Sequence, residues 1–75
     1  MYTKDNLPPK IALLMAAYQV DRELVNDRFL KVCNRSEQYG FDGLEIYEEL
    51  CRLDYNNKDL RSPECQLMVM RYINS

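Results

Sequence analysis

The segment Phe41-Asp-Gly-Leu-Glu-Ile-Tyr-Glu-Glu-Leu-Cys-Arg-Leu-Asp-Tyr55 carries the clearest helical signal in this chain of 75 residues. Asp42 is followed three residues later by Glu45, which is the spacing of a capping box at the start of a helix. Apolar residues then recur every three to four positions, as they do on one face of a helix. We therefore predict a helix over residues 43–55, ended by the asparagines at 56 and 57.

Three further helices are predicted around this segment. Pro8-Pro9 opens one over residues 9–20, and Ser62-Pro63-Glu64 opens the last over residues 63–73. Between them, Asp21 is a candidate cap for a helix over residues 22–38 that stops at Gly40. Because no Gly or Pro separates the first two helices, a single long kinked helix is an alternative. No segment alternates with a period of two, so we predict an all-α chain, a small bundle of three to four short helices.

The chain is expected to form one small domain. Residues 1–7 are predicted to be a flexible N-terminal arm, and residues 8–75 a single helical domain. A domain of this size has a limited core, and such domains often depend on metals, disulfides or self-association for stability.

Composition argues against several classes of function. The chain has 10 basic and 12 acidic residues, and this net charge of −2 argues against direct binding to nucleic acid. It has no histidine, and its three cysteines are odd in number and widely spaced, so we expect no catalytic site, no metal site, no cofactor and no disulfide framework. The longest apolar run, Ile11 to Tyr18, is too short to cross a membrane, and no secretory signal is present. We therefore expect a non-enzymatic, cytoplasmic protein.

Both ends of the helical region are unusually apolar. Residues 10–20 and 65–73 are apolar around most of the circumference of a helix, where a surface helix normally has one apolar stripe. The two opposed stripes of the first helix suit a central core helix, whereas the last helix, rich in Met and Tyr, suits contact outside the monomer. The residues predicted to form a partner or dimer interface are Leu67, Met68, Met70, Tyr72, Met15 and Tyr18.

Two charged stripes suggest other surfaces. An acidic docking face on the third helix, which could meet a basic groove on a partner, would comprise Asp42, Glu45, Glu48 and Glu49. A basic stripe on the second helix, Arg28, Lys31 and Arg35, is the basis of an alternative function as a dimeric helix-turn-helix DNA-binding regulator.

A chain of this length without catalytic groups is expected to act by occupying the surface of another molecule. We predict a stoichiometric protein–protein interaction module, self-associating as a homodimer. Its expected role is that of a small phage or mobile-element inhibitor or regulator, of the anti-defence type, of a larger host protein or nucleoprotein complex. A small structural subunit or adaptor of a larger complex is a further alternative.

Overall fold

Four α-helices and one short 3-10 helix make up the computed structural model of this protein, which describes all 75 residues. The elements are α1 (Pro9–Ala17), η1 (Arg22–Leu24), α2 (Asp27–Tyr39), α3 (Gly43–Leu53) and α4 (Pro63–Asn74). There is no sheet, and the only β-type pairing is an isolated bridge between Thr3 and Asn6. The all-α prediction is confirmed.

The first helix ends earlier than predicted, at Ala17 instead of residue 20. Gln19 adopts a positive φ of 57°, the Val20 amide donates to the Met15 carbonyl at 2.7 Å, and the Gln19 amide donates to the Ala16 carbonyl at 3.2 Å. These two bonds form a Schellman motif, which normally places a glycine at the position of positive φ. Because a glutamine occupies that position here, the sequence carried no stop signal.

The second predicted helix is present, but it begins at Asp27 instead of residue 22, because the chain breaks before Asn26. Asp21 does act as a cap, accepting from the Glu23 amide at 2.9 Å, but it caps only the 3-10 helix η1. Val25 is then extended, and Asn26 starts α2 by accepting from the Phe29 amide at 3.0 Å. The alternative of one continuous kinked helix is excluded by the same break.

The predicted starts of the last two helices are confirmed. The Asp42 carboxylate accepts from the Leu44 and Glu45 amides at 3.0 and 3.4 Å, and the Ser62 hydroxyl accepts from the Cys65 amide at 3.1 Å. Helix α3 ends at Leu53, two residues before the predicted end, because Asp54 leaves the helical region with a φ of −126° and a ψ of 70°.

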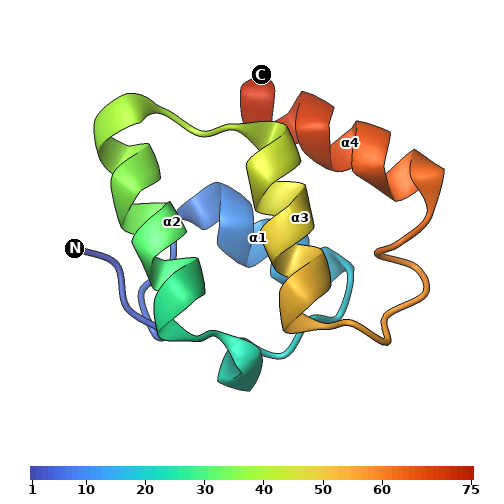
Figure 1. Cartoon of the computed structure of the whole chain (residues 1–75), viewed down its shortest axis with the longest axis horizontal. Helices are drawn as coiled ribbons and strands as arrows, with labels where there is room; N and C mark the ends of the chain where they lie inside the picture. Colours follow the sequence, from blue (N-terminus) through green and yellow to red (C-terminus); the bar gives the residue numbers. More distant parts are fainter.

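The helices enclose a core to which all of them contribute. Its fully buried side chains include Ile11, Met15, Phe29, Ile46, Leu50, Leu60 and Val69. In Figure 1, α2 and α4 lie at opposite sides of the molecule, with α1 and α3 between them. Helix α3 packs most closely against α4, and α1 also contacts α4. The molecule measures 30 × 26 × 17 Å along its principal axes.

Residues 1–7, which we expected to form a flexible arm, make specific contacts with the helical region. The Tyr2 amide donates to the Asn34 side chain at 2.6 Å, and Lys4 pairs with Glu23 at 2.9 Å. Leu7 is buried in the core. The segment is therefore packed against η1 and α2 in this structure.

Candidate functional site

An apolar groove runs between α1 and α4. Its volume is about 330 Å³, and every side chain that lines it is hydrophobic. The lining residues are Leu13, Leu14, Ala17, Tyr18, Met68 and Tyr72. The two helices run antiparallel here. Lys10 near the start of α1 bonds to the carbonyls of Tyr72 and Ser75 at the end of α4, whereas Tyr18, just past the end of α1, lies near Cys65 at the start of α4.

The groove exists because α1 buries only one of its two apolar stripes. Ile11, Leu14 and Met15 lie in the core, while Leu13 on the opposite stripe is 62% exposed. The expectation that α1 is a central core helix is therefore wrong. A helix that is apolar all round normally has neighbours on every side, and α1 has none over Leu13 and Ala17.

A second set of exposed apolar side chains continues from the groove onto α4. Met68, which lines the groove, is 62% exposed, and its neighbour Leu67 is 59% exposed. With Leu13 they are the three most exposed aliphatic side chains within the α-helices. We name the groove-lining residues together with Leu67 the α1–α4 face.

Polar contacts hold both ends of the groove. At one end the Lys10 ammonium donates to the Tyr72 and Ser75 carbonyls at 3.2 and 3.1 Å, and it lies 5.6 Å from the centre of the Tyr72 ring. At the other end Asn57 donates to the Tyr18 carbonyl at 2.9 Å. A hydrogen bond to Cys65 raises the pKa of the Tyr18 phenol, with burial adding to the effect. The two aromatic rings are thus positioned before any partner binds.

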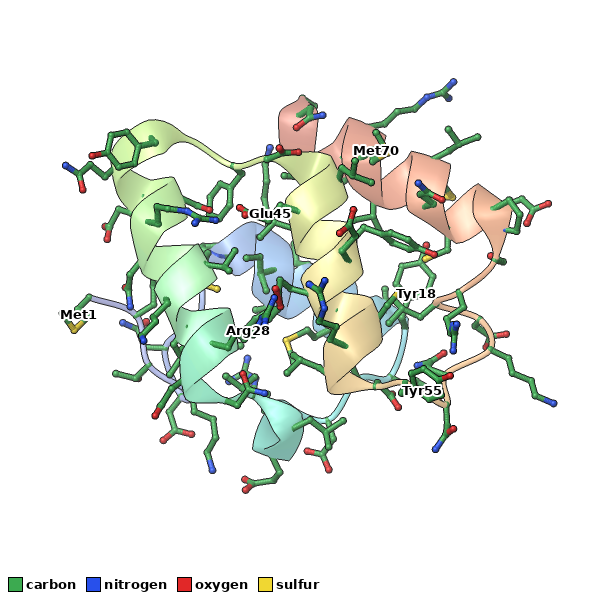
Figure 2. The ribbon with its side chains drawn as sticks, in the orientation of Figure 1. Met1, Tyr18, Arg28, Glu45, Tyr55 and Met70 are labelled. Atoms are coloured by element: carbon green, nitrogen blue, oxygen red, sulfur yellow. The ribbon has the colours of Figure 1, made fainter.

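The structure brings together four of the six residues predicted for the interface. Tyr18, Met68 and Tyr72 share the groove, and Leu67 lies beside it. Met15 is only 1% exposed and belongs to the core, so it cannot contact a partner. Met70 is half-buried, and its backbone lies against Gly43 at the start of α3, on another side of α4 (Figure 2).

Leu13, Leu14 and Ala17 are the site residues that the sequence-based prediction missed. The signal for Leu13 and Ala17 was the second apolar stripe of the first helix, which we assigned to the core, whereas Leu14 belongs to the buried stripe and lines the groove from there.

The residues of the predicted acidic docking face are largely occupied within the molecule. Glu49 is buried, and it accepts from Arg28 at 3.0 and 3.2 Å and from Arg52 at 2.9 Å. Glu45 pairs with Arg35, and the Asp42 carboxylate caps α3. Glu48 is the one member that is exposed and has no hydrogen-bonding or ionic partner.

The basic stripe faces the same carboxylates. Arg28, Lys31 and Arg35 line a polar groove of about 450 Å³ between α2 and α3, together with Val32, Glu45 and Glu49. In Figure 2, Arg28 and Glu45 both lie in this region. The hydrogen bond to Glu45 raises the pKa of Arg35, so this guanidinium stays charged and paired. Only Lys31 is left as a cation without a carboxylate partner, and carboxylates beside it would repel a phosphate.

A helix-turn-helix that reads DNA with the basic stripe of α2 would pair α2 with α1. These two helices are separated by residues 18–26, which include η1, instead of by a turn of three to four residues. The arrangement of α2 and α3 also differs from a helix-turn-helix. The two helices are joined by residues 40–42 and lie side by side and antiparallel (Figure 1). In a helix-turn-helix the second helix crosses the first at a steep angle and enters the major groove. Here the second helix carries Glu45, Glu48 and Glu49 against a single Arg52, which is the wrong charge for DNA.

No cluster of potential metal ligands is present. No three His, Cys, Asp or Glu side chains come together closely enough to hold an ion. All three cysteines are free, and burial raises the pKa of Cys33 to about 11, so its thiol stays protonated at neutral pH.

None of the helices combines the length and the apolar character needed to cross a bilayer.

Comparisons with models of protein families, with curated proteins and with solved structures find no match to this chain, so the groove has to be interpreted from its own geometry.

Proposed function

We propose that this protein is a non-enzymatic protein-binding module that acts stoichiometrically through the α1–α4 face. The observation that carries the proposal is the cluster of exposed apolar side chains, Leu13, Leu67 and Met68, around a groove lined entirely by hydrophobic residues. Exposed apolar patches of this kind on small proteins mark surfaces that another molecule covers.

The chemistry of the groove favours a protein as its ligand. Pockets for small molecules place a few polar groups so that they orient the ligand, and no charged or amide side chain lines this groove. Met and Tyr side chains instead suit a protein surface, because Met adapts its shape and Tyr contributes a large, rigid contact area.

The wider role that we propose is inhibition or regulation of a larger host protein or nucleoprotein complex, as by a small phage or mobile-element protein of the anti-defence type. Support comes from the size of the exposed apolar face relative to so small a chain. Three free thiols suit the reducing cytoplasm, which is the compartment we propose. A role as a small subunit or adaptor of a larger complex would use the same face.

Site-specific photocrosslinking tests the proposed function. A photoreactive residue replaces Met68 in the α1–α4 face, and in a matched control it replaces Glu48, which is exposed on α3 and unpaired. In cells that naturally make the protein, we expect crosslinks to protein from position 68 and not from position 48. The purified crosslinked protein should then bind the wild-type chain, and Met68→Asp should weaken that binding at least about tenfold because it places a charge in an apolar contact.

The proposal would be overturned by the absence of protein crosslinks from position 68, or by the same crosslinks from both positions. Binding of the purified partner that Met68→Asp leaves unchanged would also overturn it.

A further inference from the structure

The outward side of α4 carries a symmetric arrangement of charged and apolar residues. Glu64, Leu67, Met68 and Arg71 follow the spacing i, i+3, i+4, i+7, which places them in one row along the helix. All four residues are exposed. The row therefore reads acid, apolar, apolar, base from the start of the helix to its end.

The two charges at the ends of this row have no partner within the chain. The four ion pairs of the structure involve other residues, and neither Glu64 nor Arg71 makes a side-chain hydrogen bond. This differs from α2 and α3, where three of the arginines are paired with Glu45 or Glu49. Opposite charges that flank an exposed apolar pair are a common edge for a protein interface, since charge complementarity sets orientation and register.

We infer that the occupant of the α1–α4 face is a second copy of this chain, docked through an antiparallel pair of α4 helices. This inference rests on the proposed function and names the partner that covers this face, so the larger host protein of the wider role would bind the dimer instead of competing for the face. A two-fold axis between residues 67 and 68 would place Leu67 of each copy opposite Met68 of the other. The same axis places Glu64 of each copy opposite Arg71 of the other, so both ends of the row are matched at once.

The register is specific to self-pairing in this direction. A parallel pair would place Glu64 opposite Glu64 and Arg71 opposite Arg71, which repel each other. Met68 also lines the groove, so the central contact continues onto the α1 side of the face, where Leu13 is exposed. Helix α4 has 12 residues and is about 18 Å long, which gives a contact at the small end of specific interfaces. We therefore expect a dimer that dissociates on dilution.

Charge exchange between variants tests this register. Light scattering after size exclusion, with samples up to about 1 mM, should show the wild-type chain moving from monomer to dimer as concentration rises. Glu64→Arg alone and Arg71→Glu alone should each weaken the dimer at least about tenfold, because each turns two attractive pairs into two repulsive ones.

An equimolar mixture of these two variants should dimerise again, since the mixed dimer places arginine opposite glutamate at both ends. The double variant that carries both changes should also dimerise. Recovery on mixing shows at the same time that both variants are folded. Glu37→Arg, an exposed charge reversal on α2 at the opposite side of the molecule, is the matched control and should leave the dimer unchanged.

Three results would overturn the inference, and they bear differently on the proposed function. If the wild-type chain stays monomeric up to about 1 mM, the dimer is excluded. The proposed function is then decided by the photocrosslinking experiment alone. A dimer that Met68→Asp disrupts but the charge variants do not would use this face in another register. A dimer that none of these changes affects would be formed by another surface.

Discussion

At the scale of single residues, Gly43 determines how closely α3 approaches α4. A β-carbon added at this position would lie 2.7 Å from the Cα and 2.8 Å from the carbonyl oxygen of Met70. The Gly43 amide also donates to the Asn74 side chain at 3.0 Å. The start of α3 is therefore fixed against the second half of α4 by close backbone packing and by a hydrogen bond. From the sequence this glycine could be identified only as the first residue of a helix.

Gly43→Ala is predicted to destabilise the fold by about 1–3 kcal/mol, the usual cost of forcing an extra carbon into a packed contact. The added carbon would clash with backbone atoms of Met70, which cannot rotate away as a side chain can. Helices α3 and α4 would therefore have to move apart. Urea unfolding followed by circular dichroism measures the change. Glu48→Ala, on the exposed side of α3, is the control and should stay within about 0.5 kcal/mol of wild type. An equal effect of the two substitutions would refute the packing argument.

At the candidate site, side-chain chemistry alone predicted three residues that the structure places together in the groove, and their contact with a partner stays a prediction. Tyr18, Met68 and Tyr72 were identified because amphipathic or adaptable side chains on apolar helices are common at interfaces. Met15 was predicted to lie at the interface and Leu13 was not, whereas Met15 is buried and Leu13 is exposed. Both lie on apolar stripes of one helix, and hydrophobicity does not rank one stripe above the other. Only the position of α1 against its neighbours decides which stripe is buried.

At the scale of the elements, helix starts were predicted better than helix ends. Asp42 and Ser62 are caps with side-chain acceptors, and a cap of this kind is a local property of the sequence. The end of α1 depends on a glutamine in a conformation that glycine usually adopts, and the break before α2 depends on an extended Val25. Neither feature has a local signature, because the packing of the surrounding core stabilises it.

The start of α2 provides a test of this distinction. Asn26→Ala removes the side-chain acceptor of the Phe29 amide and is predicted to lower the free energy of unfolding by about 1 kcal/mol. Asn56→Ala is the matched control, since Asn56 is exposed and makes no side-chain hydrogen bond. The free energies come from urea unfolding curves of the two variants and the wild type. Should Asn26→Ala prove as stable as the control, Asn26 would not be the cap that starts α2.

At the scale of the whole molecule, the charges of α2 and α3 pair with one another, which leaves few of them free to form the two predicted charged surfaces. Glu45 and Glu49 of α3 face Arg28 and Arg35 of α2, which lie far from them in the sequence. The acidic and basic stripes were correctly found as stripes, but their pairing is a tertiary contact between two helices. No periodicity within either helix could have predicted it. The all-α architecture was predictable because it depends on local periodicity and capping alone.

The buried thiol of Cys33 makes the stability of the whole molecule sensitive to alkaline pH. Burial raises the pKa of Cys33 from 9.0 to about 11, and burial with a hydrogen bond to Cys51 raises the pKa of Tyr47 from 10.0 to about 12. Both groups are neutral when protonated, so the unfolded chain loses these protons at a lower pH than the folded chain. The contribution of these two groups to the free energy of unfolding is complete below about pH 9. It is lost as the pH rises through the pKa values that the groups have in the folded chain.

The free energy of unfolding is therefore predicted to fall between about pH 9 and about pH 11, with up to about 2–3 kcal/mol of the loss due to Cys33. Urea unfolding at a series of pH values under reducing conditions measures the profile. Cys33→Ala should show a shallower decline over the same range, whatever its stability at neutral pH. If the decline is equally steep in this variant, ionisation of Cys33 is not its cause.

The pairing of α1 with α4 has a consequence for the timing of binding during synthesis. Helices α3 and α4 are separated only by residues 54–62 and can pair after a short loop closes, whereas α1 must wait for a helix made some fifty residues later. In a nascent chain on the ribosome, Leu13 and Ala17 are therefore present without α4, which forms the other side of the groove, until that helix has emerged. The binding that we propose for the α1–α4 face therefore requires that α4 has been translated, so an incomplete chain would lack the complete face.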